Sequence, residues 1–132
     1  DGTDEVIARY PSVKLHRHDV NRGYGAALIS AFRFAIDGGY DAVLTMDSDG
    51  QHEPSLIPRF LSELGIEHPS ASAADIVSGS RYLGHFEADT AAPPERRRIN
   101  ALVTDELNAC LRLNITDAFC GFKAYRVSAL SR

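Results

Sequence analysis

The chain has 132 residues, with 14 Lys and Arg against 18 Asp and Glu, so its formal net charge is −4. This length suits one domain, and a composition of 44% hydrophobic and 24% charged residues excludes intrinsic disorder and coiled coil. The mild acidity argues against nucleic acid as a partner, because nucleic-acid binders carry basic surfaces. No apolar stretch reaches the roughly 18 residues that would span a membrane.

Taken in chain order, the hydrophobic periodicity alternates between helix and strand. The expected helices cover residues 4–10, 27–36, 55–64 and 95–113, and the expected strands cover 13–18, 41–47, 75–80 and 119–125. Gly38-Gly39 supplies a left-handed end for the second helix, and Pro58 is tolerable only in the first turn of the third. The alternation predicts an α/β fold: a three-layer α/β/α, Rossmann-like, mostly parallel sheet with right-handed crossovers. We expect residues 1–132 to form a single domain that is incomplete at both ends.

The cysteines and the first residues bear on the compartment. Cys110 and Cys120 lie among apolar neighbours and form no Cys-x-x-Cys pair, so we expect both to be reduced thiols in the core. Residues 1–4 have neither the charged nor the apolar region of a secretory signal. The expected localisation is therefore cytoplasmic.

An acidic motif, Asp47-Ser48-Asp49-Gly50-Gln51, follows the strongest predicted strand. Ligands of open α/β sheets bind beyond the carboxyl ends of the strands. Asp47 and Asp49 are two positions apart, which in extended backbone puts both carboxylates on one side. Such oxygen ligands suit Mg²⁺ or Mn²⁺ and leave positions for phosphate oxygens. The alternative is an acidic turn, but two carboxylates at a sheet edge are costly without a counter-ion, so the metal site is the favoured hypothesis.

Two other motifs share these letters. An EF-hand loop would need Gly at its sixth position and Glu at its twelfth, where this sequence has His52 and Pro58, so it is excluded. A haloacid-dehalogenase-type phosphatase resembles Asp-x-Asp-Gly-Thr near the start of its chain, and Gln51 stands where its Thr should be. That phosphatase is kept only as a minor alternative.

Five segments, in order, resemble motifs of family 2 glycosyltransferases. Asp1-Gly2-Thr3 resembles the end of their Asp-Asp-Gly-Ser-x-Asp-Gly-Thr segment, 21–27 resembles their Asn-x-Gly-x-Gly-x-Ala turn, and 47–52 resembles their metal motif. Gly79-Ser80-Arg81-Tyr82 and residues 117–126 are similar to motifs of the polyprenyl-phosphate (dolichyl-phosphate) mannosyl- and glucosyltransferase branch. The resemblance implies a GT-A fold and inverting, metal-dependent transfer of a hexose from a nucleotide diphosphate sugar to a polyprenyl-phosphate-type acceptor.

The same resemblance implies roles for individual residues. Asp47, Asp49 and Gln51 would hold Mg²⁺ or Mn²⁺ at the donor's diphosphate, which places Gln51 at the substrate as well. A cation there would stabilise the negative charge that grows on the departing nucleoside diphosphate. Arg81 would donate to a phosphate through its planar fork, the alternative being a surface arginine at the end of a strand.

Three arginines, Arg96, Arg97 and Arg98, stand at the start of the last predicted helix, where they oppose the helix dipole. An anionic partner is therefore expected: the donor diphosphate, a lipid-linked phosphate or anionic lipid headgroups. Arg97 or Arg98 is the better candidate for the contact. The alternative is a solvated face relieved by Glu87, Asp89 and Glu95. The family often has a Ser-Arg pair just beyond this cluster, and Asn100-Ala101 stands there instead, which weakens the case for the usual acceptor-phosphate contact.

The role expected of Asp117, our candidate catalytic residue, depends on the acceptor. A phosphate monoester is already anionic, so Asp117 would organise the site, whereas a hydroxyl needs a base and Asp117 is the natural one. Lys123 and Arg126 either add phosphate contacts or face solvent. For His52 a structural role, capping the helix after Pro54, is preferred to a contact with the acceptor.

Three hypotheses result from these residues. The leading one is hexosyl transfer to a lipid phosphate, with the protein peripheral at the inner face of the membrane. The second keeps the donor and uses a soluble hydroxyl acceptor, as in polysaccharide or osmolyte synthesis. The third is a nucleotide-binding fragment without catalysis.

Overall fold

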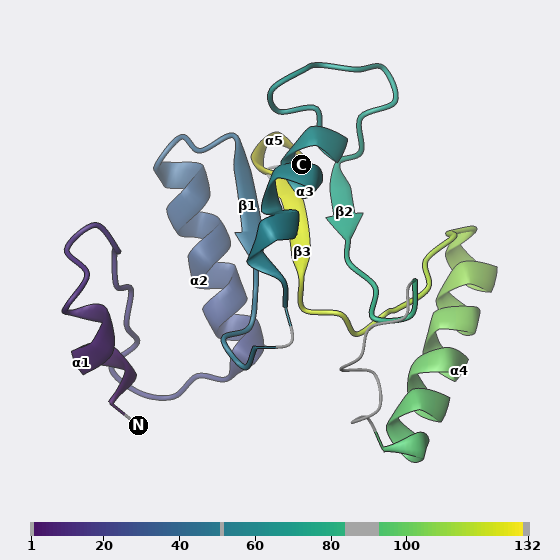
Figure 1. Ribbon diagram of the computed structural model, residues 1–132, viewed down its shortest axis with the longest axis horizontal. Helices are drawn as coiled ribbons and strands as arrows, with labels where there is room; N and C mark the ends of the chain where they lie inside the picture. The colour runs from purple at the N-terminus through teal and green to yellow at the C-terminus, as the bar shows by residue number, and fades with distance from the viewer. Residues whose placement is uncertain (1, 51, 84–92, 131–132) are drawn as a thin grey trace.

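The computed structural model describes residues 2–50, 52–83 and 93–130 (Figure 1). The helices are α1 (Thr3–Ile7), α2 (Tyr24–Asp37), α3 (Ile57–Glu63), α4 (Pro94–Leu111) and α5 (Val127–Leu130), with a 3₁₀ helix, η1 (Pro54–Leu56), leading into α3. The strands are β1 (Ala42–Thr45), β2 (Ile76–Ser78) and β3 (Lys123–Arg126). The four predicted helices and three of the four predicted strands are confirmed. Residues 13–18 form no strand, because a period-two pattern becomes a strand only where a neighbouring strand pairs with it.

The three strands form one sheet in the order β1-β3-β2. β3 is antiparallel to both neighbours, with Lys123 opposite Thr45 on one side and opposite Ser78 on the other. The prediction of a mostly parallel sheet is therefore wrong for these strands, because the residue pattern of a buried strand does not encode the direction of its partner. As a consequence, the segment that enters β3 reaches the same edge as the ends of β1 and β2.

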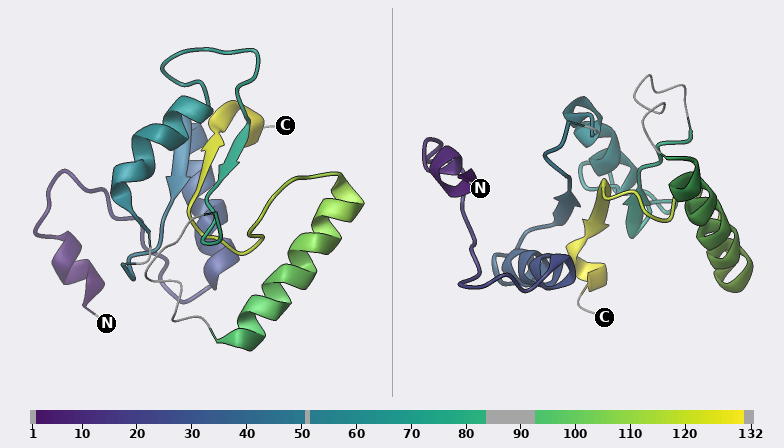
Figure 2. Two further views of the ribbon diagram at one scale, coloured as in Figure 1. Left: turned by 45° about the vertical axis from the view of Figure 1, so that its right-hand side comes forward. Right: turned by 90° about the horizontal axis from the view of Figure 1, so that it is seen from below.

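The core lies between α3 and one face of the sheet. Phe60 packs there with Leu64, Cys120, Phe122 and Ala124, and Leu64 and Ala124 are fully buried. The residue after Ala124, Tyr125, points to the other face, where its ring meets Phe32 of α2 at 4.9 Å between centroids. α2 and α3 thus contact opposite faces of the sheet (Figure 2).

Two local predictions about helix ends are confirmed. Pro58 occupies the first turn of α3, where its missing N–H costs nothing. α2 ends at Asp37 and is followed by Gly38 and Gly39, of which Gly39 takes the left-handed conformation with φ 67°.

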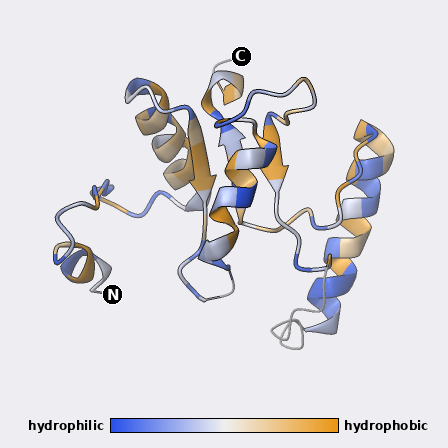
Figure 3. Cartoon of the chain, turned by 45° about the horizontal axis from the view of Figure 1, so that its top comes forward, coloured by the Kyte–Doolittle hydropathy of each residue, from blue (hydrophilic) through white to orange (hydrophobic). Residues whose placement is uncertain are grey.

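The apolar face of α4 is not buried as the periodicity predicts. Leu102 is 60% exposed and Leu111 61%, and the buried residues of the helix are Asn100 and Thr104. α4 stands away from the sheet (Figure 2), and its first turns are hydrophilic whereas β1 and β2 are hydrophobic (Figure 3). The reason is that α4 docks onto the rest of the molecule through polar side chains rather than through its apolar stripe.

The two cysteines differ in burial because α4, which carries Cys110, does not pack its apolar face against the core. Cys120 is buried in the core, as predicted, whereas Cys110 on α4 is exposed, so the prediction of two core thiols is wrong for Cys110. Among the helices that the structure describes, none has the length and apolar character needed to cross a membrane.

Candidate active site

Three motif segments meet at one edge of the sheet. β1 leads to Asp47, β2 leads to Gly79, and residues 117–122 lead into β3. Two hydrogen bonds join them: the Gly79 amide donates to the Phe122 carbonyl at 2.8 Å, and the Thr45 hydroxyl donates to the Gly121 carbonyl at 2.8 Å. Residues that are distant in the sequence are therefore held together at the carboxyl ends of β1 and β2, which is the edge where α/β sheets bind ligands.

The acidic turn is held by His52. The Asp47 amide donates to His52 Nδ1 at 2.9 Å, and the imidazole stacks on the ring of Phe122 with centroids 5.1 Å apart. His52 Nε2 lies 3.9 Å from Asp47 Oδ2. The prediction that His52 caps the helix after Pro54 is therefore wrong: the side chain that caps η1 is Glu53, which accepts from the Ser55 amide, and His52 instead contacts Asp47 and Phe122.

The carboxylates of the acidic motif fit a divalent cation. Asp47 and Asp49 are both exposed, and a Cβ on Gly121 would stand 2.6 Å from Asp47 Oδ2, so the glycine keeps open a space that any other residue would fill. In the parts of the chain that the structure describes, no group of three or more His, Cys, Asp and Glu could hold a metal unaided. Mg²⁺ commonly takes one or two carboxylates and completes its shell with water and substrate phosphate, so this donor set suits it. Gln51 lies outside the described residues.

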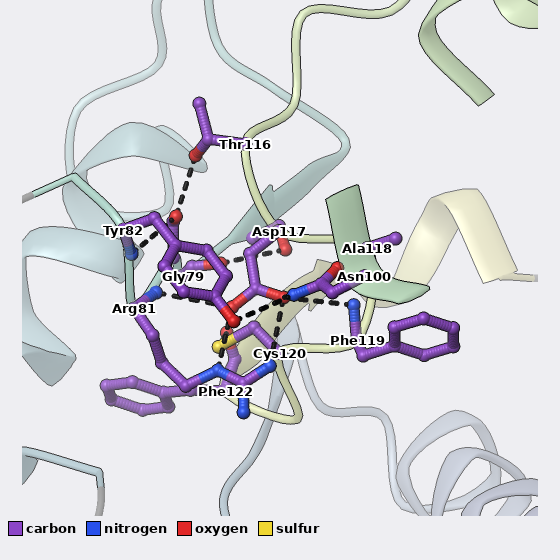
Figure 4. A network of polar contacts seen from close by, with 12 residues as sticks. Gly79, Arg81, Tyr82, Asn100, Thr116, Asp117, Ala118, Phe119, Cys120 and Phe122 are labelled. Carbon is purple, nitrogen blue, oxygen red and sulfur yellow. Dashed lines mark hydrogen bonds and ion pairs between the residues drawn. The ribbon is translucent and has the colours of Figure 1, made fainter. Parts of the chain in front are cut away.

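Arg81 and Asp117 form a bidentate ion pair at the same edge (Figure 4). Arg81 Nε donates to Oδ2 at 2.8 Å, Arg81 Nη2 donates to Oδ1 at 3.1 Å, and the Arg81 amide donates to Oδ2 at 3.3 Å. The hydrogen bond to Asp117 raises the pKa of Arg81 above its already high value. The carboxylate thus fixes the plane of the guanidinium, whose side chain is still 37% exposed.

Asp117 is 1% exposed, and both of its oxygens are occupied. Oδ1 also accepts from Asn100 Nδ2 at 2.7 Å and from the Phe119 amide at 3.1 Å. Burial by itself would raise the pKa of Asp117, but the hydrogen bonds from Arg81 and Asn100 outweigh it and hold this pKa below its ordinary 3.8. At neutral pH Asp117 is an anion without a free lone pair of the kind that a base needs.

A polar seam on α4, made of Asn100, Thr104 and Asn108, docks the helix onto the segment before β3. The three residues lie four positions apart and so share one face. Thr104 Oγ1 donates to Asn100 Oδ1 at 3.0 Å and accepts from the Ala118 amide at 3.1 Å. Asn108 exchanges two hydrogen bonds with the backbone of Ile115, at 2.9 and 3.0 Å. Sequence reasoning missed this seam, although its spacing of four within the helix was visible.

The remaining predicted residues are placed as follows. Arg97 and Arg98 are exposed in the first turns of α4, while Glu87 and Asp89, proposed to relieve them, lie outside the described residues. The Lys123 ammonium donates to the Cys120 carbonyl, so it contacts the loop that carries Asp117. Arg126 is at the other end of β3, where its guanidinium donates to the Leu64 carbonyl, and the structure does not bring it to the site.

Comparison with known proteins gives the family. The family model described as glycosyl transferase family 2 matches residues 1–132. An undecaprenyl-phosphate mannosyltransferase of Micrococcus luteus is 33% identical over 130 residues, covering 98% of this chain and 50% of that protein. A polyprenol monophosphomannose synthase of Mycolicibacterium smegmatis is 28% identical over 137 residues, covering 100% of this chain and 49% of that protein. No solved structure matches significantly.

The chain therefore spans about half the length of these two relatives. The match of the family model extends over the whole sequence, including the acidic motif, the segment of Arg81 and the segment of Asp117 that meet at the sheet edge. The chain belongs to glycosyl transferase family 2.

Proposed function

We propose that the protein transfers a hexose from a nucleotide diphosphate sugar to a polyprenyl-phosphate-type acceptor, with inversion, on a GT-A fold. The observation that carries the proposal is the meeting of the acidic turn at Asp47 with the Arg81–Asp117 pair at one sheet edge. A diphosphate donor needs a cation, and a phosphate acceptor needs a fixed positive charge. This edge offers the Asp47 carboxylate for the cation and the Arg81 guanidinium for the phosphate. The names of the two relatives, an undecaprenyl-phosphate mannosyltransferase and a polyprenol monophosphomannose synthase, support the lipid-phosphate acceptor.

Apart from Arg126, which lies at the other end of β3, the predicted site residues have roles in this proposal. Asp47 and Asp49, with Gln51 added by the family resemblance, would hold Mg²⁺ or Mn²⁺, which stabilises the charge on the leaving nucleoside diphosphate. Arg81 binds a phosphate oxygen through Nη1, which donates to none of the residues that the structure describes. Lys123 and the exposed Arg97 or Arg98 add further phosphate contacts.

The acceptor is inferred from the state of Asp117. A general base works best with a pKa near the working pH and a lone pair directed at the proton it takes. Asp117 has a lowered pKa, and its oxygens already accept hydrogen bonds from Arg81, Asn100 and Phe119. We therefore assign it the organising role, which suits an acceptor that is already anionic. A polyprenyl phosphate resides in a membrane, so in this proposal the protein works as a peripheral protein at the cytoplasmic surface of that membrane.

The test is hexose transfer with GDP-mannose and UDP-glucose as donors and a short polyprenyl phosphate in detergent as the acceptor, with Mn²⁺ and then with EDTA. We expect transfer that EDTA abolishes and that Asp49→Ala lowers at least a hundredfold. Asp105→Ala, which removes an exposed carboxylate of α4, is the matched control and should retain activity. Unchanged transfer in Asp49→Ala would contradict the metal assignment.

Changing the acceptor in the same assay distinguishes the proposed enzyme from the hydroxyl-acceptor enzyme and from a non-catalytic nucleotide-binding protein. Transfer to glycerol or free glucose, with none to polyprenyl phosphate, would favour the hydroxyl-acceptor enzyme. Nucleoside diphosphate binding without transfer from either donor would favour the non-catalytic protein.

A further inference from the structure

We propose that Asn100 is a positioning residue for Arg81. Its side-chain amide holds the Asp117 carboxylate coplanar with the Arg81 guanidinium, so that the two groups form their pair of hydrogen bonds. The proposal rests on the phosphate-binding role proposed above for Arg81.

The orientation of the Asn100 amide is determined from both ends. Asn100 is 3% exposed; its Oδ1 accepts from Thr104 Oγ1 at 3.0 Å, and its Nδ2 donates to Asp117 Oδ1 at 2.7 Å and to the Tyr82 hydroxyl at 3.3 Å. Thr104 Oγ1 accepts from the Ala118 amide, which leaves its hydrogen for Asn100. Flipping the amide would put oxygen against the carboxylate, so only one orientation satisfies Thr104, Asp117 and Tyr82 together.

The carboxylate needs such a restraint because the terminal torsion of Asp is broad and permits rotation. Arg81 can make two parallel hydrogen bonds only while the carboxylate is coplanar with its fork. The Asn100 amide and the Phe119 amide hold Oδ1, and the Arg81 amide holds Oδ2. Of these three donors only Asn100 uses its side chain, since Phe119 and Arg81 donate here from the backbone. The Asn100 hydrogen bond, at 2.7 Å, is the shortest of the three.

Loss of the Asn100 donor therefore affects Arg81 indirectly, through the Asp117 carboxylate that both side chains contact. The guanidinium side chain is partly exposed, so once the carboxylate rotates, Arg81 regains rotamer freedom that a bound phosphate must remove again. The charge of the site is unchanged, so the expected effect is weaker phosphate binding through disorder of Arg81.

Asn100→Asp gives a test with a pH signature. The variant is isosteric, but at pH 7.5 it places a second carboxylate against Asp117, so we expect affinity for Mn²⁺-pyrophosphate to fall about tenfold relative to the wild type. Two carboxylates in contact share a proton as the pH falls, and the shared O–H then restores the lost donor. The variant-to-wild-type ratio should therefore recover toward one by about pH 5.5.

Asn108→Asp is the matched control, because Asn108 belongs to the same seam and bonds to the backbone of Ile115 rather than to Asp117. Its affinity ratio should stay near one at both pH values. Asn100→Ala, which removes the donor without adding charge, should weaken binding at both pH values with no recovery.

A second measurement separates this proposal from the proposed function. In ¹⁵N-arginine NMR the Arg81 Nε–H, identified by its absence in Arg81→Lys, should exchange slowly in the wild type and in Asn108→Asp and at least tenfold faster in Asn100→Ala. If this holds while the wild type binds no pyrophosphate, the positioning role stands and the proposed function fails. Equal Nε–H exchange in Asn100→Ala and the wild type would overturn the positioning role. Unfolding of both Asn100 variants beside a folded Asn108→Asp would overturn it too, by assigning Asn100 to stability.

Discussion

The carboxylate of Asp47 lies against the α-carbon of Gly121, so that a Cβ at Gly121 would stand 2.6 Å from Asp47 Oδ2. The two residues belong to different motifs, one at the end of β1 and one in the segment that enters β3. Gly121 has no positive φ, so the space for Asp47, rather than backbone freedom, explains the glycine.

Gly121→Ala should therefore reduce metal binding more than stability. The methyl group pushes away the end of a flexible, exposed side chain, which costs little folding energy but moves the Asp47 carboxylate. We expect Mn²⁺ affinity, measured by electron paramagnetic resonance titration, to fall at least tenfold. Gly25→Ala in α2, where an added Cβ meets nothing within 4 Å, is the control and should bind Mn²⁺ normally. Wild-type affinity in Gly121→Ala would contradict the placement of the cation at Asp47.

The ion pair of Asp117 and Arg81 predicts a pH dependence of stability. The pKa of Asp117 is lowered in the folded protein, so its contribution is present above the ordinary value of 3.8 and is lost as the pH falls through the folded-state pKa. Asp117→Asn should cost about 2–4 kcal/mol of unfolding free energy at pH 7, toward the lower end because Arg81 is partly exposed. Urea denaturation should show this difference shrinking at pH 3. An equal difference at both pH values would contradict it, and Asp37→Asn, at an exposed site, serves as the control.

The unequal burial of two leucines predicts where the apolar stabilisation lies. Leu64 is fully buried against Phe60 and Phe122, so Leu64→Ala should cost about 2–5 kcal/mol. Leu102 is on the exposed face of α4, and Leu102→Ala should change the free energy of unfolding by about 0.5 kcal/mol or less. Thermal unfolding compares the two. A loss in Leu102→Ala as large as that in Leu64→Ala would mean that the apolar face of α4 is covered in solution.

The two thiols should react at different rates. Cys110 is exposed, whereas Cys120 is in the core, where burial raises the pKa of its thiol and suppresses the reactive thiolate. With an aromatic disulfide reagent at pH 8 we expect one fast equivalent, which Cys110→Ser removes, and a second equivalent only after denaturation. Two fast equivalents in the folded wild type would contradict the burial of Cys120.

Local sequence patterns determined the helices, three of the four expected strands and the acidic turn of this protein. Pro58 and Gly39 mark helix ends in the structure as they do in the sequence, and Asp47 follows β1 as the apolar run before it predicts. These features depend on backbone preferences within a few residues, which is why the sequence predicts them. The order of the motifs likewise indicated the family, which the comparison confirmed.

Only the tertiary structure decided which of these residues meet. The antiparallel direction of β3 brings Gly121 to Asp47 and Asp117 to Arg81, and a parallel β3 would have put its entering segment at the opposite edge. The tertiary structure likewise determines that α4 buries Asn100 and leaves its apolar face exposed. Strand direction and the buried face of a helix depend on partners far along the chain, and a periodic pattern states what a segment can bury without stating what it packs against.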